Sequence, residues 1–449
     1  MATSRGASTL TARLLTLLCL WGCGHSARTE TMRHALDAGD LRGAIGSLNQ
    51  ELGVKSDREL PKKMDDDALL VLDRASLQQA RGQFRLSQRD FETADKAIDR
   101  LDIQHSTADD IGKYMFSDSS GRYRAPAYEK LMINTLNMMN YLEQRDLSGA
   151  LVEARRLAVT QRYYRDGRSE GDSAILGLAG FLAGLAYEKS GQYDEALRYY
   201  DDALAVHDLH GLDSTIRRLF AKSSYRSPRL EAHAARAPEI EDDEHAEIIT
   251  VIGYGRVPHK VAYRLPIGLA LTRFSYALRP DDVNAANRLA AQGLVTWINF
   301  PGLARAREPM EFPVVRIDGK PVPVEDAVSV TSEVRREWQR IEGAVVGSAI
   351  TRLITRYASG AIAGAVVDGM SKQSGLGALV SLAVQGGLAA ADVPDTRSWE
   401  TLPARVAVVR TRVPAGRHTL ALSARGVSRT QTVELPARSW LFVSMQALR

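Results

Sequence analysis

The chain has 449 residues, with 58 Lys and Arg against 54 Asp and Glu, which gives a formal net charge of +4. Such a small charge with interspersed signs gives no reason to expect a nucleic-acid partner. The 2 cysteines exclude a disulfide scaffold and a cysteine-rich metal or iron–sulfur site. Hydrophobic residues at 45% and charged residues at 25% are ordinary for folded domains, and the length predicts about two to three of them.

Residues 1–22 have the organisation of a secretory signal peptide. Arg5 and Arg13 precede an apolar core, residues 14–21, that is too short to span a bilayer. The adjoining Leu20-Trp21-Gly22-Cys23 resembles the lipobox of bacterial lipoproteins, which has a Leu three residues before the Cys and a small residue just before it. Trp21 departs from that pattern, because the family prefers a small residue at its position.

This resemblance implies a lipid anchor at Cys23. The thiol would carry a diacylglycerol thioether, and the amine freed by cleavage a further acyl chain such as palmitate, which together attach a protein stably to membrane lipid. Gly24 is not the Asp that retains such lipoproteins at the inner membrane, so the implied location is the outer membrane of a bacterial cell envelope, facing the periplasm. In the alternative interpretation Cys23 is an incidental residue after an ordinary secretory signal.

Residues 183–204 resemble a tetratricopeptide repeat (TPR), a unit of two antiparallel helices. Gly184 and Ala196 stand where the two helices approach closely, and Gly191 is placed to end the first helix in a left-handed turn. The resemblance implies a groove between the helices that can bind a protein partner. The residues predicted to line its binding side are Tyr187, Tyr193, Tyr199 and Tyr200.

Weaker copies of this pattern surround Ala44, Ala94 and Ala150. Stacked helix pairs bury a continuous core and expose a concave surface suited to peptides or proteins. We therefore expect residues 23–225 to form an all-α, TPR-like solenoid. A spacer or a dimerisation face is the alternative role for such a solenoid.

One segment lies within the predicted repeat region and another follows it. Residues 104–128 are not repeat-like and are predicted to be a surface crossover, with a binding loop as the alternative. Residues 226–247 lack apolar periodicity and contain the acidic run 241–244, so we predict a linker. Consecutive carboxylates without a glycine turn do not favour a calcium site.

The remaining sequence, 248–449, has the texture of a β-rich domain. Short alternating segments are separated by turns, and Asp318-Gly319 is a hairpin signal. This spacing predicts a β-sandwich-like domain, so the whole chain is expected to be an α+β multidomain protein. The predicted strands are 248–255, 260–266, 311–317, 320–324, 405–413, 418–424, 430–435 and 440–445.

A helical insert is predicted over 332–391. Its second half is rich in Gly and Ala and contains the uncharged run 374–391, slightly shorter than a membrane span. We favour a close-packed helical hairpin resting on the β-rich domain. The alternative is a membrane-inserting or self-assembling protein that uses helices 332–391.

Residues 391–405 and 413–420, together with the lipobox and the repeats, resemble an uncharacterised family of bacterial envelope lipoproteins. Its members tend to be encoded near lipoproteins linked to peptidoglycan synthesis, which implies an envelope partner. The stretch 413–420 is also similar to the surface β repeats called PEGA domains. The family has no established activity.

The first of these stretches has two interpretations. In one it forms a ligand site from Asp395, Arg397, Ser398 and Trp399. In the favoured one it is a structural corner, in which Asp395 and Arg397 pair, Trp399 caps the sandwich and Pro403 starts an edge strand.

Catalytic motifs are missing from the sequence. His207 and His210 lie near Asp208 and Asp213, but no third ligand is evident and a surface pair is favoured over a metal site. No dinucleotide, Walker or hydrolase fingerprint is present. We therefore predict a protein that is not an enzyme, has no cofactor, and acts as an interaction scaffold for an unknown envelope protein.

Overall fold

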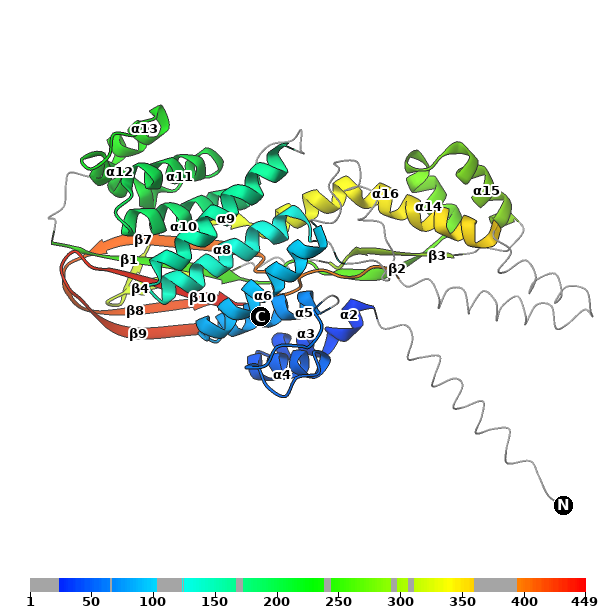
Figure 1. The fold of residues 1–449 in the computed structure, drawn as a ribbon, viewed down its shortest axis with the longest axis horizontal. Coiled ribbons are helices and arrows are strands. Elements are labelled where there is room, and N and C mark those ends of the chain that lie inside the picture. Colours follow the sequence, from blue (N-terminus) through cyan, green and yellow to red (C-terminus); the bar gives the residue numbers. More distant parts are fainter. Residues whose placement is uncertain are drawn as a thin grey trace, which may run out of the picture.

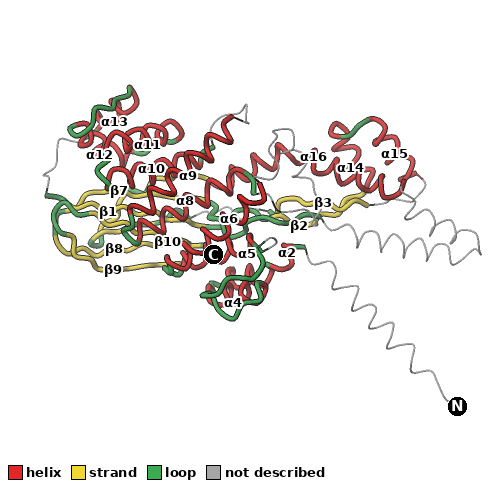
Figure 2. The backbone as a smooth tube through the Cα atoms, in the orientation of Figure 1, coloured by secondary structure: helices red, strands yellow, loops and turns green. Residues whose placement is uncertain are grey.

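The computed structural model describes residues 24–64, 67–102, 123, 125–166, 173–237, 244–291, 297–305, 311–358 and 394–449. The signal segment, Cys23, most of the insert 104–128 and the uncharged run 374–391 lie outside these ranges. Within them the fold is mixed α+β, with helices in the N-terminal half and several sheets in the C-terminal part (Figures 1 and 2).

Helices account for most of the described chain before residue 237. Helices that follow one another in the sequence, such as α5 and α6 or α10 and α11, pack against each other. They are α2 (His25–Arg28), α3 (Glu30–Asp37), α4 (Leu41–Glu51), α5 (Ala68–Ala80), α6 (Phe84–Asp102), α8 (Ala127–Glu143), α9 (Leu147–Asp166), α10 (Ile175–Lys189), α11 (Tyr193–Val206), the 3-10 turn η1 (His210–Leu212), α12 (Asp213–Phe220) and α13 (Pro228–Arg236).

Four helix pairs, α3–α4, α5–α6, α8–α9 and α10–α11, are joined by the same turn. Each turn has a residue in the left-handed region, Gly39, Gly82, Arg145 or Gly191, with φ of 81°, 72°, 58° and 77°. The next amide in each case donates to the carbonyl five residues back, at 2.8 to 3.0 Å, which satisfies a carbonyl that the helix end leaves free. The left-handed turn predicted at Gly191 is confirmed.

The second helix of each pair contributes a small residue at the contact. Ala44, Ala94, Ala150 and Ala196 are all fully buried. A side chain of this size lets two helix backbones approach closely, as at α10–α11, where a Cβ built on Gly184 would lie 3.1 Å from Ala196 O. Pairs of consecutive helices are therefore present around Ala44, Ala94, Ala150 and Ala196.

The C-terminal strands form two four-stranded sheets and a two-stranded ribbon within the described residues. The first sheet has the order β10-β1-β7-β6, in which β1 runs parallel to β10 and antiparallel to β7. The second has the order β5-β4-β8-β9. The strands are β1 (Ala246–Tyr254), β2 (Lys260–Pro266), β3 (Trp297–Leu303), β4 (Val314–Ile317), β5 (Lys320–Val322), β6 (Glu325–Ser329), β7 (Arg405–Val413), β8 (Gly416–Ala424), β9 (Val427–Leu435) and β10 (Trp440–Ala447).

The first sheet is covered on both faces, as β1 shows. Ile249 and Val251 point into the core shared with the helices, and Ile248 and Ile252 into the core shared with the second sheet. Every residue of β1 is consequently buried. Helices, first sheet and second sheet thus form three successive layers (Figure 1).

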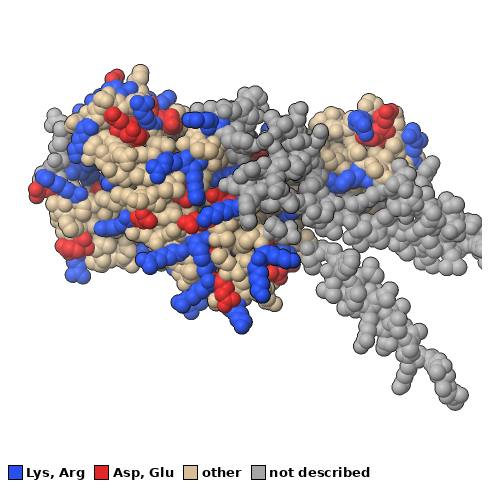
Figure 3. All heavy atoms as spheres, in the orientation of Figure 1, with Lys and Arg blue, Asp and Glu red and all other residues tan. Residues whose placement is uncertain are grey.

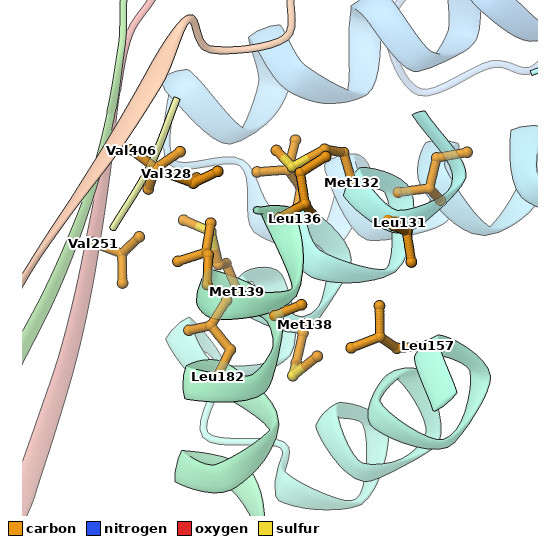
Figure 4. Close-up of a cluster of buried hydrophobic side chains, with 14 of the residues drawn as sticks. Leu131, Met132, Leu136, Met138, Met139, Leu157, Leu182, Val251, Val328 and Val406 are labelled. Atoms are coloured by element: carbon orange, nitrogen blue, oxygen red, sulfur yellow. The ribbon is translucent and has the colours of Figure 1, made fainter. Parts of the chain in front are cut away.

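The contact between the helices and the first sheet is apolar. Met139 of α8 and Leu182 of α10 lie opposite Val251 of β1, with Val328 and Val406 from the neighbouring strands completing the cluster (Figure 4). All five side chains are at most 4% exposed. The helical layer and the sheet therefore share one hydrophobic core rather than meeting as separate domains.

A smaller body extends from this core. It contains the β2–β3 ribbon, α14 (Ile267–Phe274), the 3-10 turn η2 (Ser275–Ala277), α15 (Pro280–Ala291) and α16 (Val330–Ala358). Helix α16 begins in the main core through Val330 and Val334 and continues into a separate core through Val346 and Ile350. No helix in the described parts of the chain is long and apolar enough to cross a membrane.

One prediction about the connections is corrected. The predicted linker 226–247 contains α13, which begins at Pro228 and is capped by Ser227, whose side chain accepts from the amide of Leu230. Strands β7 and β8, which flank Pro414-Ala415-Gly416, belong to different sheets. The hairpin predicted at Asp318-Gly319 is confirmed, since β4 pairs with β5 across it.

The left-handed turn gives a test of stability. Gly191→Ala places a side chain at φ 77°, with no neighbour within 4 Å to clash, so we expect a loss of about 1 kcal/mol in the free energy of unfolding from backbone strain alone. The matched control is Gly46→Ala in the interior of α4, also without a neighbour within 4 Å, which should stabilise by about 0.5–1 kcal/mol. Urea denaturation measures both, and equal signs for the two variants would contradict the turn.

Candidate functional site

The segment Pro394–Ala404 is an extended stretch packed between the helices and the loop that follows β1. It has no regular helix or strand, yet most of its residues are buried. Buried irregular backbone must satisfy its polar groups elsewhere. Its amides and carbonyls bond to helices on one side and to the loop after β1 on the other, as Ala404 N donating to Gly255 O (3.2 Å) shows.

Trp399 is the apolar anchor of this segment. It is 1% exposed and packs edge-on against Phe91 of α6, with ring centroids 5.7 Å apart. Its indole Nε1 donates to Ser76 Oγ (3.1 Å), and its backbone amide donates to the Glu129 carboxylate (3.0 Å). The prediction that Trp399 caps the sandwich is therefore wrong, because its side chain lies in the core of the helical layer.

The predicted ligand group does not converge on one opening. Asp395 and Arg397 pair with each other, with Nε 2.8 Å from Oδ1 and Nη2 2.7 Å from Oδ2, as the structural interpretation predicts. Ser398 Oγ accepts from the amide of Lys260 (3.1 Å). The expected edge strand after Pro403 is also corrected, since β7 begins at Arg405 and lies between β1 and β6.

Two buried carboxylates hold the centre of the segment. Asp73 Oδ1 accepts from the amides of Glu400 (3.0 Å) and Thr401 (2.9 Å) and from the Thr401 hydroxyl (2.9 Å). The Glu400 carboxylate in turn accepts from Arg33 Nη1 (2.6 Å) and Thr29 Oγ1 (2.9 Å). Residues about 330 to 370 positions apart in the sequence are joined in this way.

The pKa values of this pair are set by burial. Desolvation and the nearby Glu400 charge raise the pKa of Asp73, and desolvation raises the pKa of Glu400 to about 7. Desolvation also raises the pKa of Glu129, which binds the Trp399 amide. These shifts arise in a packed interior and not in an open cleft, so we interpret the cluster as structural.

A second charged cluster joins the helices to the first sheet. Arg410 of β7 donates to Glu188 of α10 (2.7 Å) and to Glu247 of β1 (2.8 Å). Lys189 Nζ bridges the same two carboxylates, at 2.8 Å from Glu188. Desolvation raises the pKa values of Glu188 and Glu247, but the charges of Arg410 and Lys189 lower them further than that. Both carboxylates therefore remain ionised inside the protein.

The predicted tyrosine surface is only partly available. Tyr200 is fully buried, and its hydroxyl donates to Glu188 (2.7 Å) and accepts from Arg410 (2.7 Å). Its hydroxyl therefore points toward Arg410 of the first sheet, and its ring lies against α10 at Gly184. Tyr187 and Tyr199 stack at 5.2 Å, Tyr187 being 7% exposed. Tyr199 and Tyr193 retain partly exposed surface.

The histidine cluster near α12 is larger than predicted. His233 of α13 joins it, with Nδ1 2.6 Å from Asp213 Oδ1, and Arg236 bonds Asp208 at 3.0 Å. Among the residues that the structure describes, no group of three His, Cys, Asp or Glu side chains could hold a metal ion.

The sequence analysis did not predict the buried charged residues, although their positions next to apolar runs indicated them. Asp73 and Arg74 interrupt the apolar run 69–77, and Arg410 directly follows the apolar run 406–409. A charged residue on the buried face of an otherwise apolar element needs a buried partner. The partners lie in distant parts of the chain, and only the tertiary structure identifies them.

Comparison with known proteins adds no relative. No family model matches the chain, and no curated protein matches it either. Function must therefore be argued from the residues themselves.

Glu400 gives a pH-dependent test. Between pH 4.5 and about 7 the folded protein keeps a proton on Glu400 that the unfolded chain has lost, so stability falls as the pH rises through this window. Relative to Glu400→Gln, the wild type should lose about 3 kcal/mol of unfolding free energy across it. Urea denaturation at a series of pH values measures the difference.

The matched control is Glu434→Gln on the exposed side of β9, where the same chemical change removes no buried carboxylate. Its stability profile should run parallel to the wild type. A Glu400→Gln profile that also runs parallel would show that the buried carboxyl does not titrate in this range.

Proposed function

We propose that this protein is a lipid-anchored component of a bacterial cell envelope that acts as a non-catalytic scaffold for another envelope protein. The observation that carries the proposal is the lipobox-like Leu20-Trp21-Gly22-Cys23 placed directly before the first packed helix, α2. An outer-membrane location facing the periplasm follows from Gly24 after the cysteine. A link to peptidoglycan assembly rests on the family resemblance.

The finer description of the fold belongs to the same proposal. Four helix pairs with identical turns and buried small residues support a TPR-like solenoid. Two four-stranded sheets that share a core support a β-sandwich. Both are architectures that commonly serve as interaction modules, which is an argument from fold alone.

The outward side of the helical layer is the surface we assign to the partner, because the first sheet occupies the other side. Helix α9 presents Val152, Arg155, Val159 and Arg162 at helical spacing, and Val159 is 71% exposed. Tyr199 lies beside them, since Arg155 is close enough to influence its pKa. On the face shown in Figure 3 both charge signs are interspersed with uncharged areas.

The lipid anchor is tested by metabolic labelling with a palmitate analogue and by the mass of the mature N-terminus. We expect the wild type to be labelled and Cys23→Ser to be unlabelled, because only the Cys23 thiol can accept the diacylglycerol. Cys19→Ser is the matched control, since Cys19 is removed with the signal peptide, and it should be labelled like the wild type. An unmodified thiol at Cys23 would overturn the anchor.

The partner surface is tested by photo-crosslinking in the native envelope. A photoreactive residue in place of Val159 should give a discrete adduct with one envelope protein, because this position is exposed on the α9 stripe. The control carries the same residue in place of Thr430, which is exposed on β9. The absence of an adduct at 159, or the same adduct at both positions, would contradict the assigned surface.

A further inference from the structure

The proposed anchor leaves almost no spacer between lipid and fold. Gly24 is the single residue between Cys23 and His25, where α2 begins. At roughly 3.3–3.6 Å per extended residue, the acylated residue lies within about 7 Å of His25. A phospholipid headgroup layer is about 5–8 Å thick. If Cys23 is acylated, α2 must therefore lie at the headgroups.

Helix α2 is held firmly to the body of the protein. His25 is 7% exposed, and burial lowers its pKa to about 3, so the ring is neutral. Ser26 N donates to Thr396 Oγ1 (3.1 Å), and Ser26 O accepts from Arg33 Nη2 (2.6 Å). Arg28 bonds both Glu51 (3.0 Å) and Asp67 (3.1 Å). The fold cannot move away from the bilayer by unwinding this helix without breaking these bonds.

The β2–β3 ribbon starts beside α2. Lys260 N donates to Ser398 Oγ, two residues from the Thr396 hydroxyl that holds Ser26. The ribbon runs outward from this point, and its far end, where Pro266 pairs with Trp297, is about 20 Å away at ~3.3 Å per residue. In Figure 1, α14 and α16 lie on one side of the ribbon and α2 on the other.

The two faces of the ribbon differ in their side chains. One face packs Ile298 and Phe300 under α14 and α16 in a separate core. The opposite face carries Arg264, Pro266 and Trp297, all exposed, and Trp297 is 45% exposed. The Arg264 guanidinium lies 5.2 Å above the Trp297 ring.

We propose that this outer face of the β2–β3 ribbon, defined by Arg264, Pro266 and Trp297, contacts the headgroups of the bilayer that holds the anchor. Tryptophan is enriched at membrane–water interfaces because its ring is amphipathic. Arginine forms bidentate hydrogen bonds with phosphate. Contact at α2 and at the ribbon end fixes the tilt of the protein on the membrane. The inference rests on the proposed acylation of Cys23.

The test uses the full-length lipidated protein in vesicles of phosphatidylethanolamine and phosphatidylglycerol, with and without brominated acyl chains that quench tryptophan. The wild type should show quenching, and Trp297→Phe should lose it. Trp440→Phe is the matched control, because Trp440 lies at the start of β10 in the first sheet and not on the β2–β3 ribbon. This variant should retain the quenching. Insertion of a flexible Gly/Ser linker of about 20 residues after Gly24 should also abolish quenching by releasing the constraint.

The outcomes separate the two proposals. Flotation with vesicles together with quenching lost only in Trp297→Phe and in the linker variant supports the contact. Flotation with no quenching, or with quenching that survives Trp297→Phe, overturns the contact while leaving the anchor intact. That result is expected if a second copy of the chain or its own segment 359–393 covers the ribbon. Failure to float, with an unmodified Cys23, overturns both proposals.

Discussion

The burial of Pro394–Ala404 between the helices and the loop that follows β1 is the constraint on which the structure depends. This segment forms no strand pairing, so several of its backbone amides donate hydrogen bonds to carboxylates of helices that are far away in the sequence. Asp73 and Glu129 accept from the backbone of Trp399, Glu400 and Thr401. Leaving such amides unpaired in a dry interior costs more than each bond returns, so the helices and the C-terminal strands are obliged to fold together.

The same constraint determines which surfaces are free. Helix pairs that stood alone would have both of their sides exposed, but here the first sheet occupies one side through an apolar core and the Arg410 cluster. Tyr200, which was predicted to bind a partner, is buried in the interior instead. Among the described residues, the outward side of α9 and one face of the β2–β3 ribbon keep exposed side chains, and these two surfaces lie on different elements.

Local features were predicted well from the sequence. Positive φ at Gly191 and the hairpin at Asp318-Gly319 depend on two or three neighbouring residues, and most strand segments were marked by their own apolar patterns. Strands β3 and β6 were not predicted. Pairing was not predictable in the same way. Strand β1 pairs with β10, almost 200 residues later, and Pro414-Ala415-Gly416 resembles a hairpin turn although it connects two sheets. The non-periodic stretch around Trp399 indicated a buried feature but not which core would receive it.

The sequence by itself carries the proposed anchor at Cys23, and it predicted many of the helical and extended segments, because charge, hydrophobic periodicity and turn chemistry act over a few residues. Helices α14 and α15 and strands β3 and β6 were not among them. The tertiary structure alone decided which carboxylates are buried, which tyrosines are covered and which bonds hold α2 to the body of the protein. These properties arise from contacts between residues hundreds of positions apart, which no local pattern encodes.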